Sequence, residues 1–216
     1  MGKQNWKPGN MLNPVPAVMV SVTDENGRSN IITVAWTGTI CTNPPMVSIS
    51  VRPSRYSYDI IDRTGGTICT NPPMTYISVR PERHSYEMIK NSGEFVINLT
   101  TKQLTRATDF CGVRSGRDVD KFKEMKLTPL PMQQVKAVGI AESPANIECR
   151  VVEKKALGSH TMFIAEVVGV TIDDRYMNET GKFEINESGL VMYSHGEYFS
   201  LGEKLGKFGY SIKKKS

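Results

Sequence analysis

A tandem duplication constrains the fold of this chain more than any other feature of its sequence. Residues 38–61 are nearly repeated by residues 66–89, and eighteen of the twenty-four aligned positions are identical. Two copies are too few for the open array of units that a solenoid needs to bury its core. Each copy has an apolar segment followed by arginine and serine, residue types that suit an anionic group. We interpret the duplication as a local event inside one domain.

Length and charge favour an ordinary globular protein. A chain of 216 residues can bury one substantial core, so we expect a single domain spanning residues 1–216. The formal net charge of +5 is small, and part of it lies in the run 213–215, so nucleic-acid binding is not required. Residues 1–16 lack the features of a secretory signal, and no apolar run has the length of a membrane span. The sequence therefore predicts a cytoplasmic protein with no membrane partner and no nucleic-acid partner.

The cysteines do not indicate a metal site. The chain has four of them, without a Cys-x-x-Cys pair and without ligand spacing to the three histidines. Cys41 and Cys69 occupy equivalent positions in the two copies, and we expect Cys111 and Cys149 to be buried thiols. We predict no disulfide.

Local sequence patterns predict mainly strands with a few short helices. Residues 17–22 and 30–36 are rich in strand formers, and Asn26-Gly27 between them favours a hairpin turn because both residues tolerate positive φ. The other expected strands are 46–51 with its counterpart in the second copy, 94–99, 147–155 and 161–172. Helices are expected at 53–61 with its counterpart and at 102–110, and a loop at 112–120. Short turns join most neighbours, so an antiparallel barrel is favoured over a parallel sheet with crossover helices.

Two groups of residues could bind a ligand. Thr33, Trp36, Thr37 and Thr39 could hydrogen-bond and pack against a planar heterocycle, or they could belong to a half-buried strand with a core tryptophan. In the first copy, three residues lie around an expected helix start, where a phosphate is favoured; the alternative is a solvated helix face. These residues are Arg52, Arg55 and Ser57. The sequence contains no nucleophile elbow, Walker loop or dinucleotide fingerprint, and we discount the isolated His195-Gly196-Glu197 as a deaminase signature.

Longer sequence words carry a family resemblance. The chain resembles the flavin reductase-like and flavoredoxin family of FMN-binding split barrels in three motifs. They are the segment 35–46, the motif Ser-Val-Arg-Pro-x-Arg-x-Ser-Tyr and the segment 93–99. Residues 115–122, 158–164 and 201–210 resemble later motifs of the family, so the resemblance covers roughly residues 10–213.

The resemblance implies an all-β, Greek-key split β-barrel with short helices. It implies a homodimer that holds FMN noncovalently near the subunit interface. Carried over by motif, the residues in the flavin environment are Asn30, Trp36, Thr37, Thr39, Arg52, Arg55, Ser57 or its counterpart Ser85, Lys121, His160 and Tyr193. Among these, Ser57 would lie by the phosphate, and Lys121 near the ring would favour the reduced flavin by Coulombic attraction. No side chain is expected to be a covalent catalyst, because the cofactor performs the electron chemistry.

The chain departs from the family pattern because it has two strand-plus-helix units in place of one. The first copy continues without interruption from Trp36, so we expect it to fill the phosphate site and residues 62–89 to form an inserted strand and helix at the edge of the barrel or on the partner subunit. A natural duplication and an error in the gene model would both produce this pattern.

Three functions are compatible with the sequence. The first is an FMN-binding, NADH- or NADPH-dependent flavin oxidoreductase. The second is a flavoredoxin-type electron carrier between redox protein partners, without nicotinamide turnover. The third is a barrel that binds single-stranded nucleic acid through aromatic and basic residues, whose affinity would fall steeply with salt.

Overall fold

Strands dominate the protein in the computed structural model, which describes residues 2–7, 12, 14–15, 18–23, 29–34, 37–42, 45–49, 74–207 and 209–212. The strands are β1 (Lys3–Trp6), β2 (Val18–Thr23), β3 (Ser29–Val34), β4 (Thr37–Thr42), β5 (Pro45–Ile49), β6 (Met74–Val79), β7 (Glu94–Asn98), β8 (Pro129–Leu130), β9 (Gly139–Ile140), β10 (Ala145–Ala156), β11 (Thr161–Asp173), β12 (Val191–Ser194) and β13 (Glu197–Ser200). The α-helices are α2 (His84–Ser92), α3 (Thr105–Val113) and α4 (Lys121–Glu124), and the 3₁₀ helices are η1 (Lys102–Leu104), η2 (Asp174–Tyr176), η3 (Ile185–Ser188) and η4 (Tyr210–Ile212).

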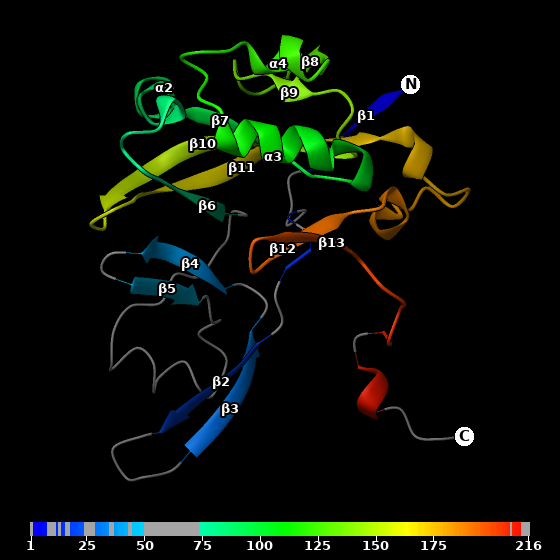
Figure 1. The fold of residues 1–216 in the computed structure, drawn as a ribbon. Coiled ribbons are helices and arrows are strands. Elements are labelled where there is room, and N and C mark those ends of the chain that lie inside the picture. Colours follow the sequence, from blue (N-terminus) through cyan, green and yellow to red (C-terminus); the bar gives the residue numbers. More distant parts are fainter. Residues whose placement is uncertain are drawn as a thin grey trace.

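Strand β11 lies at the centre of a five-stranded antiparallel sheet (Figure 1). Strand β10 pairs along one edge of β11, and β7 pairs with the far edge of β10. Two shorter strands share the other edge of β11, since β6 pairs with residues 161–166 and β1 with residues 170–173. Strand β11 is therefore hydrogen-bonded on both edges over most of its length.

The core explains why β11 is an almost continuous apolar run. Residues Ala165 and Val167 belong to the main core, which also takes side chains from β7 and β10. Met162 and Ile164, which alternate with them, pack in a second cluster with Met74 and Tyr76 of β6 and with Leu157. Because successive side chains of a strand point to opposite faces, both faces of β11 are covered. A strand covered on both faces is mostly apolar and lacks a regular alternation of polar and apolar residues.

The structure confirms the main elements expected from the sequence. The hairpin predicted for 17–36 is the antiparallel pair β2–β3, in which Val18 lies opposite Val34 and Thr23 opposite Ser29. The long strands predicted near the C-terminal half are β10 and β11, and the helix predicted for 102–110 is η1 followed by α3. Helix α3 runs to Val113, so the loop expected at 112–120 begins two residues later than predicted. The helix expected at 53–61 lies outside the described residues.

Several short strands were not anticipated, namely β1, the β8–β9 pair and the β12–β13 hairpin. The described strands form the five-stranded sheet and four separate two-stranded sheets, which are β2–β3, β4–β5, β8–β9 and β12–β13, and they do not close into one barrel. Within the described part of the chain, every helix is too short or too polar to cross a membrane.

The two copies of the duplication occupy different places. The strand of the second copy is β6, which pairs with β11 in the central sheet, and its helix is α2. The strand of the first copy is β5, which pairs with β4 in a two-stranded sheet below β6 (Figure 1). The second copy therefore contributes an edge strand to the central sheet.

Candidate functional site

Basic and hydroxyl side chains gather where β6 leads into α2. After β6 ends at Val79, a turn is closed by a hydrogen bond from the Arg83 N–H to the Arg80 carbonyl oxygen, 3.0 Å away. Helix α2 begins at His84, followed by the exposed Ser85, and Arg83 at the N-cap makes no side-chain capping hydrogen bond. The first N–H groups of a helix have no intrahelical carbonyl partner, and the helix dipole favours negative charge there. The start of α2 therefore offers donors to an anion.

The loop that follows α3 lies against this helix start. A side chain at Gly116 would meet His84 Cδ2 at 3.2 Å and Lys121 Cε at 4.0 Å, so both residues lie close to this glycine. Ser85 directly follows His84 in α2. The start of α2, which carries Ser85, and the segment between α3 and Lys121 therefore lie side by side, although they are far apart in the sequence.

Two contacts fix Lys121 in place. Asp120 caps α4 by accepting a hydrogen bond from the Lys123 N–H at 3.2 Å, which holds Lys121 in the first position of the helix. Lys121 Nζ donates a hydrogen bond to the Cys111 carbonyl oxygen near the end of α3, at 2.6 Å. An ammonium group has three N–H donors, so two remain for a ligand. Lys121 is thus positioned before any ligand binds.

The donor set at this site fits a phosphate group. Arg83 Nη1 makes a long hydrogen bond of 3.5 Å to the Gly112 carbonyl oxygen, and Arg80 Nη1 donates to Glu82 at 3.2 Å. A guanidinium has five N–H donors in a planar fork, so each arginine keeps donors beyond these contacts. The Arg80–Glu82 pair is exposed, and such pairs are weak. Glu82 is the acidic side chain nearest in sequence to these arginines, and its carboxylate would repel a neighbouring phosphate.

His160 lies at the same end of the central sheet as Arg80. The antiparallel register pairs Thr161 with Val79, so the residues just outside this pair, His160 and Arg80, occupy neighbouring strand ends. His160 is half-buried, and its Nδ1 lies 2.9 Å from the Ser159 hydroxyl. The imidazole is therefore oriented by its neighbour in the turn between β10 and β11.

Tyr193 lies on a different element, the β12–β13 hairpin. Its ring is 67% exposed and contacts the ring of Tyr198 edge-on, with centroids 5.3 Å apart. The Tyr198 hydroxyl donates to Asp109 on α3 at 3.4 Å, and the pKa of Tyr198 is raised by partial desolvation and by this carboxylate. The sequence did not single out Tyr198 or Asp109. Through them the hairpin that carries Tyr193 reaches α3, the helix whose far end contacts Lys121.

The N-terminal hairpins place the remaining expected residues only in part. Asn30 lies in β3 opposite Val22, and Thr37 and Thr39 lie in β4. Strand β4 approaches β6, because a side chain at Gly38, between these two threonines, would meet the Tyr76 hydroxyl at 2.6 Å. The other expected residues lie outside the described part of the chain; they are Trp36, Arg52, Arg55 and Ser57.

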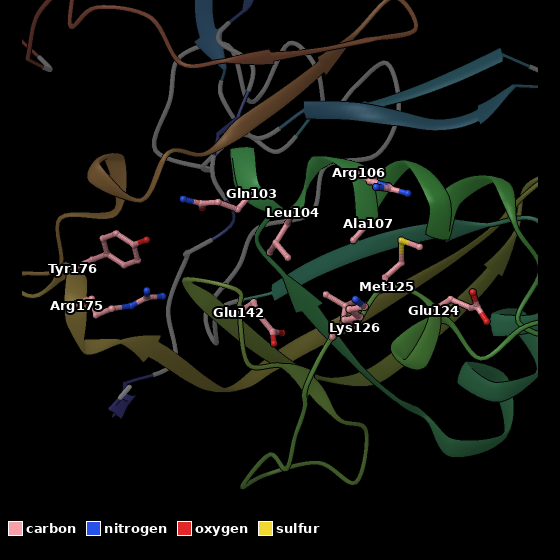
Figure 2. A pocket seen from close by; sticks show the side chains of 11 residues that line it. Gln103, Leu104, Arg106, Ala107, Glu124, Met125, Lys126, Glu142, Arg175 and Tyr176 are labelled. Atoms are coloured by element: carbon pink, nitrogen blue, oxygen red, sulfur yellow. The ribbon is translucent and has the colours of Figure 1, made fainter.

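A cleft of about 660 Å³ lies on another side of α3 (Figure 2). It is lined by residues from η1 and the start of α3, from the turn after α4 and from η2, and it includes none of the residues expected in the flavin environment. Its charged side chains are of both signs: Arg106, Lys126 and Arg175 are basic, and Glu124 and Glu142 are acidic. Such a mixed lining does not indicate a particular ligand.

One wall of this cleft is held by an ion pair whose acidic partner is buried. The Asp173 side chain is 0% exposed and accepts hydrogen bonds from the Arg175 backbone N–H at 3.0 Å and from Arg175 Nη2 at 2.6 Å. Burial alone would raise the pKa of Asp173, but the hydrogen bonds from Arg175 and the charges of Lys3 and Arg175 together lower this pKa below its usual value. The same contacts raise the pKa of Arg175. Arg175 Nε and Nη2 are thus both hydrogen-bonded to Asp173.

Comparison with known proteins decides the family. The family model described as the flavin reductase like domain matches residues 11–67 and 66–202. The chain belongs to the flavin reductase-like family. An uncharacterized protein of Archaeoglobus fulgidus is 32% identical to it over 173 residues, which cover 80% of this chain and 81% of the relative.

Solved structures of flavin reductase-like proteins share the fold. The flavoredoxin of Desulfovibrio vulgaris (Miyazaki F) is 27% identical, with a TM-score of 0.54 over 97% of this chain and 100% of that chain. The FMN-binding domain of a flavin reductases-like enzyme from Shewanella baltica is 18% identical, with a TM-score of 0.59 over 95% of this chain and 97% of that chain. The split-barrel fold class expected from the sequence is therefore confirmed, although the described sheets of this chain remain separate.

The family match also reflects the duplication. It breaks at residues 66–67, where the second copy begins, so each copy lies in a different segment of the match. The second segment contains Ser85, Lys121, His160 and Tyr193, which are the expected residues whose side chains the structure describes.

Proposed function

We propose that this flavin reductase-like chain binds FMN noncovalently and transfers electrons from NADH or NADPH to or through the bound flavin. The observation that supports the proposal is the packing of the start of α2 against the segment that leads to Lys121, in a chain of this family: Arg83 reaches the Gly112 carbonyl oxygen, and Gly116 lies against His84. Arginine, lysine, serine and helix N–H groups together match the acceptor oxygens of a phosphate monoester. FMN has such a group, whereas riboflavin does not.

The chain's own residues bind and orient the cofactor in this proposal. Ser85 and Arg83 contribute donors from the start of α2, and Lys121 adds donors from the start of α4. His160 at the adjacent strand end is oriented by Ser159 and offers its other ring nitrogen. The flavin, when bound, supplies the electron-transfer chemistry, so no side chain need form a covalent bond to a substrate.

The visible spectrum of the purified protein tests flavin binding directly. We expect a yellow protein, or a colourless one that turns yellow with added FMN, and release of the cofactor followed by mass measurement should yield FMN. A protein that stays colourless with FMN in excess, under oxidising and reducing conditions, would refute the proposal.

Anaerobic stopped-flow measurements then test the electron donor. Rapid bleaching of the flavin band with NADH or NADPH is the result expected for an oxidoreductase. A family member has no need of a Rossmann unit for this reaction, so the missing dinucleotide fingerprint does not count against it. A band that is unchanged by both nucleotides would refute nicotinamide turnover while leaving FMN binding intact.

A second candidate is an electron carrier of the flavoredoxin type, acting between redox proteins. It is favoured by the similarity to the flavoredoxin of Desulfovibrio vulgaris, which extends over nearly the whole chain. In the same stopped-flow experiment, a carrier is reduced by a low-potential protein donor such as ferredoxin and not by nicotinamides. The two candidates thus differ in the donor that bleaches the flavin.

We further propose that the chain forms a homodimer. Large apolar side chains of the C-terminal segment are exposed in the single chain; they are Met192, Tyr193, Phe199, Leu205, Tyr210 and Ile212. An exposed apolar stretch of this kind is typical of an interaction surface. Light scattering during gel filtration should give about twice the chain mass of 24.0 kDa, and a mass of one chain at micromolar concentration would contradict the proposal.

A further inference from the structure

The duplication leaves open which copy serves the cofactor, and the sheet register bears on this choice. Strand β6 of the second copy pairs with β11 over six positions, from Met74 opposite Glu166 to Val79 opposite Thr161. After α2, the single residue Gly93 in the left-handed conformation leads directly into β7, which pairs with β10. The second copy is thus joined to the central sheet at two places: through its own strand β6, and through β7, which directly follows its helix α2.

Tyr76 is one reason why the second copy fits beside β11. Its equivalent in the first copy is Ser48. Tyr76 packs with Met162 and Ile164, and Gly38 of β4 leaves room for its hydroxyl. A serine at this position would fill much less of this space, and under-filled sites in a packed interior are destabilising. The slot beside β11 therefore matches the second copy better than the first.

The helix of the second copy also contacts the sheet and segment 112–116. Tyr86 contacts the buried ring of Phe163 on β11 edge-on, with centroids 5.7 Å apart. Arg83 reaches the Gly112 carbonyl oxygen, and Gly116 lies against His84. These contacts place the start of α2, with its arginine and serine, against segment 112–116, which leads to Lys121.

We propose that the second copy, and not the first, holds the phosphate group of the flavin, through Arg83 and Ser85 together with Lys121. This inference rests on the proposed FMN binding and assigns its phosphate subsite. It reverses the expectation that Arg55 and Ser57 of the first copy serve this role, and it assigns Lys121 to the phosphate and not to the flavin ring. The first copy then makes no contact with the phosphate, although it retains the same arginine and serine word.

Matched substitutions in the two copies test the assignment on the full chain. Ser85→Ala and Arg83→Ala are compared with Ser57→Ala and Arg55→Ala, and the dissociation constants of FMN and of riboflavin are measured by flavin fluorescence. We expect each second-copy variant to bind FMN about tenfold or more weakly, as for the loss of a hydrogen bond to a charged group, with riboflavin affinity unchanged. The first-copy variants should bind both flavins like the wild type.

A variant that improves binding guards against effects of misfolding. Glu82, beside Arg80 in the second copy, has Ser54 as its equivalent in the first. Glu82→Ser removes a negative charge from the proposed phosphate site and should tighten FMN binding about two- to fivefold without changing riboflavin binding. Its mirror image, Ser54→Glu, should leave both affinities unchanged.

The outcomes separate this inference from the function on which it rests. The assignment would be overturned if FMN affinity fell in the first-copy variants alone, in both sets of variants, or in neither set. In each of these cases FMN binding by the wild-type chain would still stand. Equal losses for FMN and riboflavin in the second-copy variants would also overturn it, because the effect would then not involve the phosphate. A wild-type chain that binds neither flavin would instead refute the proposed function.

Discussion

The contact between Tyr86 and Phe163 leads to a quantitative prediction for Tyr86→Ala. The Phe163 ring is 0% exposed, and Tyr86 of α2 is half-buried against it with an interplanar angle of 63°. An edge-on ring pair contributes about 0.5–1.5 kcal/mol, and half-burial of an aromatic side chain about 1 kcal/mol more. The substitution should therefore lower the free energy of unfolding by about 2 kcal/mol, which corresponds to a fall in Tm of about 4–8 °C for a chain of this size.

The duplication provides a matched control for this experiment, because Tyr58 is the equivalent of Tyr86 in the first copy. If the second copy alone docks on β11, Tyr58→Ala should change the unfolding free energy by less than about 0.5 kcal/mol, the usual range for surface positions. Both variants are compared by urea titration and thermal unfolding in the absence of flavin. An equal or larger loss in Tyr58→Ala, or a loss below about 0.5 kcal/mol in Tyr86→Ala, would refute the argument.

Three further predictions address the cofactor, the ion pair and the core. Trp36→Ala should weaken FMN binding about ten- to a hundredfold, since a large apolar contact is worth about 1–3 kcal/mol; unchanged affinity would remove Trp36 from the site. Asp173→Asn should cost about 2 kcal/mol at pH 7, less than the sum of its hydrogen bonds because Arg175 is partly exposed. Folding lowers the pKa of Asp173, so its contribution to the free energy of unfolding is present at neutral pH and is lost as the pH falls below about 4. The urea unfolding curves of the wild type and Asp173→Asn should therefore converge in acid. The curves of the exposed control Glu179→Gln should match those of the wild type at every pH. Burial, aided by the charge of Glu148, raises the pKa of the Cys149 thiol to about 12. Iodoacetamide at pH 8 should therefore modify Cys149 only after unfolding. Labelling of Cys149 in the native protein, detected by mass spectrometry, would contradict this prediction.

The sequence predicted the elements whose local signals agree with their tertiary environment. The Asn26-Gly27 turn signal and the flanking strand formers were sufficient for β2–β3, and the long apolar runs were sufficient for β10 and β11. Strand β1 was missed because Lys3–Trp6 is short and mostly polar, and its strand conformation depends on pairing with β11. A propensity argument cannot detect a pairing with a partner so distant in sequence.

The β12–β13 hairpin had a signal that could have been recognised. His195 and Gly196 form its two-residue turn, and both have positive φ, of 50° and 89°. A two-residue connection with glycine in the second position and positive φ at both residues is typical of a tight β-hairpin turn. We considered this histidine only as part of a discounted catalytic motif, and so the hairpin that carries Tyr193 was not foreseen as a unit.

The site was predictable as a set of residue types, but the place of each copy was not. Arginine, serine and the following tyrosine are identical in the two copies, so no local argument separates Ser57 from Ser85. The separating contacts are tertiary: Tyr76 with the second face of β11, and His84 with Gly116 of a later loop. Chain distance from Trp36 favoured the first copy, whereas strand pairing with β11 favours the second.

The central position of β11 has a consequence for synthesis of the protein. Strands β1 and β6 both pair with β11, which ends at Asp173 in a chain of 216 residues. On the ribosome these two strands emerge long before their partner has been translated. Until then the nascent chain presents unpaired strand edges and two nearly identical strands that compete for one position, a situation that invites association with chaperones or with neighbouring nascent chains.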